Sequence, residues 1–217
     1  MDKTSLWYVK RKTPCSTTPT FRHVQPYAKG RVLDIGVATG EYLEKFASGS
    51  VGIDVSEINV SFCKNKGLDV QFADINQGIP FSDNLFDSVF CSHVIEHVES
   101  PLRLIQEAYR VVVPNGHVIF GVPIEKTLVH VIKEGYYEGH EGHLYGLSPE
   151  SMTRLLKQAN LIYVRSYYNF PIVNRYKPID SILQNISGSF CQYFCTMYWI
   201  VGKKSINQNC PDKRNNK

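Results

Sequence analysis

The sequence lacks several features that mark secreted and membrane proteins. Its N-terminus is polar and basic and has no apolar signal core. The six cysteines form no C-x-x-C pair, and Cys63 and Cys91 lie in apolar patterns typical of packed, reduced thiols. The most apolar late stretch, residues 182–201, has polar residues that a membrane span would not carry: Gln184, Asn185, Ser187, Gly188, Ser189 and Gln192. We therefore expect a cytoplasmic protein, in a reducing compartment, without stable membrane insertion.

No large excess of one charge runs through the chain, since the formal net charge is +4. Residues 1–31 hold seven Lys/Arg against one acid, and residues 203–217 hold five against one, which leaves −6 for the segment between them. Basic tails can attract nucleic acid or an anionic membrane, but such tails are more commonly just solvated. No aromatic and basic RNA-binding module accompanies them, so we expect no nucleic-acid partner.

The length of 217 residues is enough for one well-buried core, and the composition is that of an ordinary globular protein. We expect a single domain over residues 21–204. A loose arm (1–20) would precede it, and a disordered tail (205–217) would follow. We expect the protein to be a monomer or a homodimer.

Strands and helices alternate along this domain. The expected strands are Arg31–Ile35, Ser50–Asp54, Val70–Ala73, Phe86–Cys91, His117–Val122, Leu161–Tyr168 and Tyr198–Val201. The expected helices cover Phe21–Ala28, Glu41–Ala47, 57–66, 101–111, 148–159 and Ile179–Ile186. This order predicts an α/β fold with a doubly wound, mostly parallel sheet of seven strands and helices on both faces. Residues 124–147 break the alternation and are rich in Gly, His and Tyr.

The first expected strand runs into a loop with glycine at both ends, Gly36 and Gly40. A strand, a glycine-rich turn and a helix in this order place free backbone N–H groups beside a bound ligand. Gly36 and Ala38 could fill the first two places of a dinucleotide fingerprint, but Glu41 takes the third, and its charge repels a pyrophosphate. No Lys-Ser or Lys-Thr pair forms a P-loop either. The loop suits a ligand without phosphate, such as one that carries a positive charge, and disfavours an NAD-dependent oxidoreductase.

Two further acids follow strands at the same expected sheet edge. Asp54 closes the second strand, where a carboxylate can accept hydrogen bonds from the two hydroxyls of a ribose. Asp74 follows the third strand and could accept from an exocyclic amine. Either acid alone could simply cap a helix or a turn, but the ordered set with the glycine loop is more specific.

These motifs together resemble a class I S-adenosylmethionine-dependent methyltransferase, in the small-molecule group that includes ubiquinone-type (type 11) enzymes. The resemblance spans about residues 24–170, and residues 198–203 resemble the closing strand. It rests on Leu33–Gly40, Gly52–Asp54, Ala73–Ile75, Phe86–Val98 and Val113–His117. It implies a Rossmann-like fold and S-adenosylmethionine as cofactor, with S-adenosylhomocysteine as product. The family's usual loop has glycine where this chain has Ala38.

The resemblance implies a role for each cofactor-site residue. Asp34 would lie near the amino group, Asp54 would bind the ribose, and Asp74 would bind the adenine amine with Ile75 packing on the ring. The other expected cofactor contacts are Gly36, Val37, Ala38, Gly40, Val55, Cys91 and His93.

The segment His93–His97 has the spacing H-x-x-E-H, a metalloprotease signature when it lies on a helix. Here it follows a strand, so we expect no zinc site of that kind. His93 could face the methyl group, and Glu96 and His97 could be structural.

A second cluster, residues 138–145, lies in the irregular interval at 124–147 that would form a substrate lid. A histidine there could take a proton from an attacking hydroxyl, and His143 is the first candidate, His140 the second. The alternative is a solvated loop whose histidines make local hydrogen bonds. His140, Glu141 and His143 could also hold a metal, but nothing in the sequence defines the geometry, and we expect none.

The predicted function is methyl transfer to a small-molecule acceptor, at oxygen. The alternatives are an RNA or protein methyltransferase and a catalytically inactive cofactor-binding partner protein. Positioning of the acceptor can supply much of the rate acceleration, and a base is needed only when the nucleophile arrives protonated.

Overall fold

The computed structural model describes residues 20–124, 142–170, 183–184 and 195–206. Seven strands form one sheet in the order β3-β2-β1-β4-β5-β7-β6. The strands are β1 (Val32–Ile35), β2 (Val51–Asp54), β3 (Val70–Phe72), β4 (Phe86–Ser92), β5 (Val112–Pro123), β6 (Leu161–Asn169) and β7 (Met197–Lys204). The pairs from β3 to β5 are parallel, while β7 runs antiparallel to both β5 and β6. The predicted fold class is confirmed, with one antiparallel hairpin in the mostly parallel sheet.

The central strands read as continuous apolar runs because the sheet is covered on both faces. All four residues of β1 and of β2 are buried, including Asp34 and Asp54. Parallel strands with both faces covered have this pattern, whereas half-exposed strands alternate. Apolar sequence therefore identified these strands, and it made the two buried acids conspicuous.

Three of the described helices begin directly after a serine that caps them. The Ser56 side chain accepts a hydrogen bond from the Asn59 backbone N–H at the start of α3 (Glu57–Asn65). Ser100 and Ser148 cap α4 (Pro101–Val111) and α6 (Pro149–Gln158) in the same way, each followed by proline at the first helical position. These local signals need no tertiary contact, which is why sequence located them.

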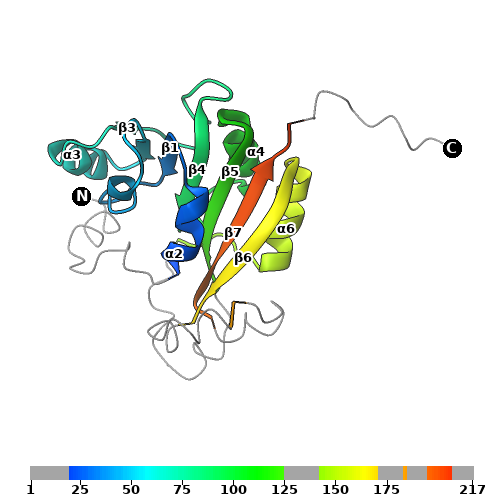
Figure 1. Cartoon of the computed structure of the whole chain (residues 1–217). Coiled ribbons are helices and arrows are strands. Elements are labelled where there is room, and N and C mark those ends of the chain that lie inside the picture. Colours follow the sequence, from blue (N-terminus) through cyan, green and yellow to red (C-terminus); the bar gives the residue numbers. More distant parts are fainter. Residues whose placement is uncertain (1–19, 125–141, 171–182, 185–194, 207–217) are drawn as a thin grey trace, which may run out of the picture.

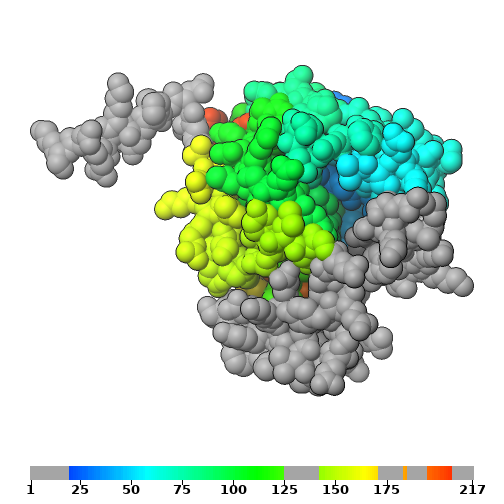
Figure 2. Space-filling model, turned by 180° about the vertical axis from the view of Figure 1, so that it is seen from behind, coloured from blue at the N-terminus to red at the C-terminus, as the bar shows by residue number. Residues whose placement is uncertain are grey.

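Helices cover the two faces of the sheet, each over its own core (Figure 1). On one face, α4 and α6 contribute Leu104, Ile105, Met152 and Leu156 to a large apolar cluster. Seen from behind, these two helices cover that face of the molecule (Figure 2). On the other face, α2 (Phe21–Val24) packs with Tyr42, Phe90 and Trp199. Helices on both faces thus agree with the expectation.

The first residue that the structure describes, Thr20, already packs into the domain. Thr20 is fully buried, and its hydroxyl oxygen accepts a hydrogen bond of 3.1 Å from the Trp199 indole N–H. The 3₁₀ turn η2 (Gln25–Tyr27) continues from α2 toward the first strand. This segment therefore belongs to the core of the domain.

The predicted helix at Glu41–Ala47 is wrong in extent. The structure has only a 3₁₀ turn, η3 (Leu43–Lys45), and the next residue, Phe46, is extended. A segment this short gains few helical hydrogen bonds for the entropy that nucleation costs, so tertiary packing decides its conformation. Leu43 and the partly buried Phe46 instead pack against Val37 and Val60.

Some expectations lie largely outside the described residues and stay predictions. They concern the arm (1–20), the lid (124–147), the helix Ile179–Ile186 and the tail (205–217). Within the described part of the chain, no helix is long and apolar enough to cross a membrane.

Candidate functional site

The site lies where the winding of the sheet reverses direction. Strand β1 lies between β2 and β4, so the chain proceeds outward on both sides from the β1–β4 junction. Ligands of open α/β sheets bind beyond the carboxyl ends of the strands at such a junction. Here β1 ends at Ile35 and β4 ends at Ser92. The segments that follow them, 36–40 and 93–98, therefore form the centre of the candidate site.

The glycine loop 36–40 makes a tight turn with three residues in the left-handed region. Gly36, Ala38 and Gly40 have φ angles of 74°, 46° and 82°. The N–H groups of Gly36 and Val37 both donate to the Ile53 carbonyl, at 2.8 and 3.1 Å. A Cβ atom at Gly36 would lie 2.2 Å from Val94 Cγ2, so only glycine allows the loop to pass this close to the 93–98 segment.

Asp54 holds the loop in place from the end of β2. Its Oδ2 accepts from the Ala38 backbone N–H at 2.9 Å, and its Oδ1 accepts from the Ser56 N–H at 2.8 Å. The Asn59 amide also donates to Oδ1, at 3.3 Å. Burial raises the pKa of Asp54, and these three hydrogen bonds oppose the increase. A carboxylate has about four lone-pair sites, so Asp54 can still accept a hydrogen bond from a sugar hydroxyl.

Asp34 is a buried acid with an unusual pKa. It is 2% exposed, and burial, followed by the neighbouring Asp54 carboxylate, raises its pKa to about 8. A second buried negative charge is expensive in this environment unless a cation compensates it. The pair of acids beneath the loop therefore suits a positively charged ligand.

An apolar surface lies next to the acids. Val55 follows Asp54 directly, and its side chain is 64% exposed, whereas most large aliphatic residues of this domain are buried. Ile75 is half-buried beside Asp74, whose Oδ1 accepts from the Asn76 N–H at 3.0 Å. Exposed aliphatic groups flanked by carboxylates fit a nucleoside, because the ring can pack on the former and its polar groups can bind the latter.

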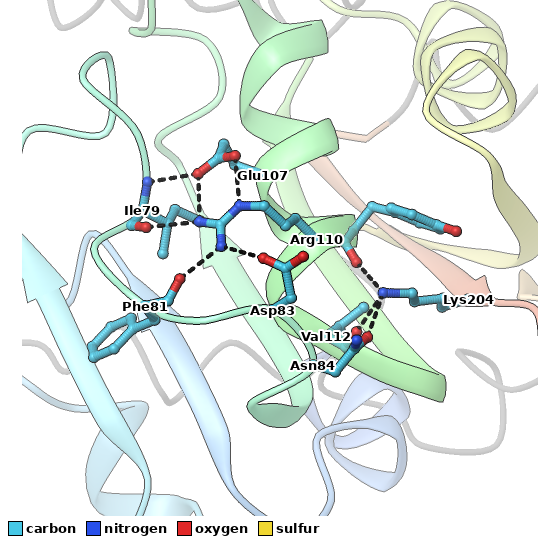
Figure 3. A network of polar contacts seen from close by, with 9 residues as sticks. Ile79, Phe81, Asp83, Asn84, Glu107, Arg110, Val112 and Lys204 are labelled. Carbon is cyan, nitrogen blue, oxygen red and sulfur yellow. Dashed lines mark hydrogen bonds and ion pairs between the residues drawn. The ribbon is translucent and has the colours of Figure 1, made fainter.

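A polar network holds the segment after Asp74 on helix α4 (Figure 3). The Arg110 guanidinium donates to the Ile79 and Phe81 carbonyls at 2.8 and 2.7 Å. It also pairs with Glu107, which accepts from the Ile79 N–H and whose pKa is lowered chiefly by the hydrogen bond from Arg110. Residues 79–83 are thus tied to a rigid helix, which limits the motion of Asp74 and Ile75.

The 93–98 segment forms turns and not a helix, so the helical context of a metalloprotease motif is absent. His93 has a φ of 54°, and its N–H donates to the Gly121 carbonyl at 2.9 Å. Cys91, just before this segment, is buried. Burial, followed by Glu96 and Asp34, raises the pKa of its thiol well above the usual value, which keeps it protonated.

Glu96 lies at the centre of a histidine cluster. It is 0% exposed, and among the described residues neither of its carboxylate oxygens has a hydrogen-bond partner. Its Oε1 lies 3.5 Å from His93 Nδ1 and 4.0 Å from both His97 Nε2 and His143 Nε2. The sequence singled out His93 and His143, and it gave Glu96 and His97 structural roles because their segment follows a strand. No sequence pattern showed that His143, far along the chain, lies beside Glu96. His140 lies outside the described residues.

Comparison with known proteins relates this chain to methyltransferases. Residues 33–120 match a protein family described as "Methyltransferase domain". A solved structure of a SAM dependent methyltransferase from Archaeoglobus fulgidus superimposes with a TM-score of 0.71 and 23% identity, covering 94% of this chain and 100% of that one. The matched segment contains the glycine loop, Asp54, Asp74 and the 93–98 turn.

Two curated relatives differ in the acceptor that their names state. The Ubiquinone biosynthesis O-methyltransferase of Alkalilimnicola ehrlichii is 26% identical over 176 residues, which are 71% of this chain and 70% of that protein. The human protein named "Probable tRNA methyltransferase 9B" is 32% identical over 124 residues, which are 49% of this chain and 27% of that protein. The chain spans about half or less of the length of several curated relatives that it matches.

These findings confirm the resemblance to class I S-adenosylmethionine-dependent methyltransferases and indicate S-adenosylmethionine as the cofactor. The roles of the individual site residues stay predictions. The names of the relatives leave the class of acceptor open.

Proposed function

We propose that this chain, with a methyltransferase domain at residues 33–120, transfers a methyl group from S-adenosylmethionine to an oxygen atom of a small-molecule acceptor. The observation that carries the proposal is the buried pair Asp34 and Asp54 beneath the glycine loop, with the pKa of Asp34 raised to about 8. A cationic ligand stabilises this site, because its positive charge compensates the negative charge of the two buried carboxylates. When bound, S-adenosylmethionine supplies an electrophilic methyl group.

Each residue of the site would bind a different part of the cofactor. Asp54 would accept hydrogen bonds from the ribose hydroxyls, since it lies at the end of β2 beside the loop. Val55 and Ile75 would pack on the adenine ring, and Asp74 would accept from its amine. Asp34 would lie nearest the positive charge. The Gly36–Gly40 loop would pass under the methionine part, with Val37, Cys91 and His93 lining the same space.

The acceptor would approach from the 93–98 side of the site. There the protein would hold the acceptor oxygen in line with the methyl group and its leaving sulfur, which is the main requirement of the reaction. An acceptor hydroxyl must also lose its proton as the new bond to carbon forms. The described histidines at this edge, His93 and His143, are 34% and 12% exposed in their side chains and can serve in that role.

Isothermal titration calorimetry tests the cofactor part of the proposal. S-adenosylmethionine and S-adenosylhomocysteine should bind in the micromolar range, and NAD should not bind. A folded sample that binds neither compound would refute the proposal. With binding established, phenols, catechols and carboxylic acids are screened for formation of S-adenosylhomocysteine. Turnover with amines or thiols alone would refute the oxygen assignment, and no turnover with any acceptor would favour an inactive binding protein.

A tRNA acceptor is the second candidate. Two observations favour it: the 32% identity to a protein named as a tRNA methyltransferase, and the excess of Lys and Arg in residues 1–31. Methylation of bulk tRNA that exceeds every small-molecule rate, and that falls after the basic residues of this segment are neutralised, would support it. Turnover of a small-molecule acceptor at a rate that those substitutions leave unchanged would support the small-molecule function.

A further inference from the structure

Glu96, His97 and His143 bring three metal-ligating side chains to one place. The carboxylate oxygen and the two ring nitrogens all lie within 4.8 Å of one another. His97 follows Glu96 in the turn after β4, while His143 approaches from a segment far along the chain. The Leu144 N–H donates to the Glu96 carbonyl at 2.8 Å, which holds the two segments together.

Burial of Glu96 is the second observation that points to a ligand. The residue is 0% exposed, and both carboxylate oxygens lack a hydrogen bond within the part of the chain that the structure describes. Burying a carboxylate without a partner raises the free energy of the folded state by roughly several kcal/mol, as for other unpaired ions, unless a cation neutralises it. Its Oε1 lies 3.5 Å from His93 Nδ1 and 4.0 Å from the Nε2 atoms of His97 and His143, so a cation placed among these nitrogens would compensate its charge.

We propose that Glu96, His97 and His143 form a binding site for a divalent transition-metal cation, with Zn²⁺ as its best match. Two imidazoles and one carboxylate are the ligand set of several catalytic zinc sites, which keep a fourth position open. Mg²⁺ and Ca²⁺ prefer sites made of oxygen ligands, so the two nitrogens disfavour them.

A hydrogen bond outside the cluster orients His97 for this role. Its Nδ1 lies 2.9 Å from the Gly142 carbonyl oxygen, which can only accept, so Nδ1 carries the proton and donates. The lone pair is then on Nε2, the atom that faces Glu96. Metal-ligating histidines are typically held by such a bond from the other ring nitrogen.

The distances are compatible with coordination after a small contraction. Bonds to zinc of about 2.0–2.1 Å place tetrahedral ligand atoms roughly 3.4 Å apart. The two nitrogens are 4.0 Å from Glu96 Oε1, and all three ligand atoms lie within 4.8 Å of one another, so these separations must shorten by about 0.6 Å and by at most about 1.4 Å. His97 lies in a turn and His143 in an irregular segment, and their rings already contact each other edge to face, with centroids 4.7 Å apart. Such a movement needs no change in the sheet.

The position of this site deepens the proposed function, on which this part of the inference rests. Val94, between His93 and the cluster, touches Gly36 of the loop, so the cation would lie beside the cofactor site. Its open position would take a hydroxyl oxygen of the acceptor and favour loss of the proton to solvent. The oxygen would then form the new C–O bond while the C–S bond breaks with its electrons on sulfur. His143 would act as a ligand in this arrangement and not as a base.

The test is titration of the full chain, purified without a histidine tag and treated with EDTA, with ZnCl₂ alone. We expect one Zn²⁺ per chain with micromolar or tighter affinity and a higher midpoint of thermal unfolding. Co²⁺ should give the visible absorption of a four-coordinate site. In E96Q and H143Q the affinity should fall by about tenfold or more. H117Q is the matched control, because His117 pairs with Ser88 on β4 away from the carboxyl edge, and it should bind like wild type.

The outcomes separate the metal site from the proposed function. Zn²⁺ binding that is equal in wild type, E96Q and H143Q, or absent from wild type, would overturn the inference. Far-UV circular dichroism and S-adenosylhomocysteine binding show whether each variant is folded. S-adenosylhomocysteine binding without Zn²⁺ binding refutes the metal site alone. Zn²⁺ binding lost in H143Q, with no cofactor binding to any protein, supports the site and refutes the proposed function.

Discussion

The backbone N–H of Ala38 donates to Oδ2 of Asp54 at 2.9 Å, so the loop after β1 is held by the carboxylate that ends β2. The same carboxylate lies beside the buried Asp34 and raises its pKa, after the larger effect of burial. Asp54 therefore links the shape of the glycine loop to the charge of the site.

Replacing Asp54 with Ala should weaken both ligand binding and the fold. Three donors, the N–H groups of Ala38 and Ser56 and the Asn59 amide, would lose their acceptor. We expect a loss of about 1–3 kcal/mol in the free energy of unfolding, from urea titration. Calorimetry should show affinity for S-adenosylhomocysteine reduced by about 10-fold to 100-fold, the effect of one or two lost hydrogen bonds. D69A, at an exposed acid, is the control, and equal affinities in the two variants would remove the ribose role of Asp54.

Replacing Ala38 with Gly should stabilise the protein. Ala38 has a φ of 46°, where an alanine side chain is strained and glycine is not. We expect the free energy of unfolding to rise by about 0.5–1 kcal/mol, less than the full strain because glycine also makes the unfolded chain more flexible. Chemical unfolding of A38G and wild type measures the difference. An unchanged or lower stability would show that the Ala38 methyl group makes a favourable contact that outweighs its strain.

The stability of the chain without ligand should depend on pH through Asp34. Its pKa in the folded state is about 8, above the ordinary 3.8, so between these values the unfolded chain has released a proton that the native state keeps. Stability from this residue is therefore complete below about pH 4 and is lost as pH rises toward 8, by at most about 1.4 kcal/mol per pH unit.

The variant D34N isolates this effect, because asparagine stays neutral. The free energy of unfolding of D34N minus that of wild type should increase steadily from pH 4.5 to pH 8, as measured by urea titration at each pH. D69N, at the exposed acid, should show no such trend. Parallel pH profiles for D34N and wild type would mean that Asp34 is ionised in the folded chain.

Replacing Arg110 with Ala should loosen the segment that follows Asp74. The guanidinium donates to two backbone carbonyls, of Ile79 and Phe81, and binds Glu107 (Figure 3). We expect R110A to lose about 2–3 kcal/mol of stability, since several partners remain unsatisfied together. R103A, on the exposed side of the same helix, should stay within about 0.5 kcal/mol of wild type. Hydrogen exchange at Ile79 and Phe81 should accelerate in R110A only, and unchanged protection there would contradict the anchoring role.

Much of the cofactor side of the site could be predicted from sequence. Asp34 lies near the end of β1, Asp54 ends β2 and Asp74 follows β3. The carboxyl ends of such parallel strands meet at one edge whatever the details of packing. The helix caps Ser56, Ser100 and Ser148 are equally local, because a side chain bonds to a backbone group three residues away. The residues at 41–47 were predicted less well, since a short segment takes its conformation from neighbours such as Val37 and Val60.

The sequence by itself determined the alternation of strands and helices, the glycine loop and the order of the acids. Each of these depends on periodicity or on a neighbour a few residues away. Only the tertiary structure decided that Glu96 and His143 meet and that Asp34 has its pKa raised to about 8. Both depend on burial and on a contact between distant segments, and a carboxylate's chemistry depends on the atoms that surround it in space.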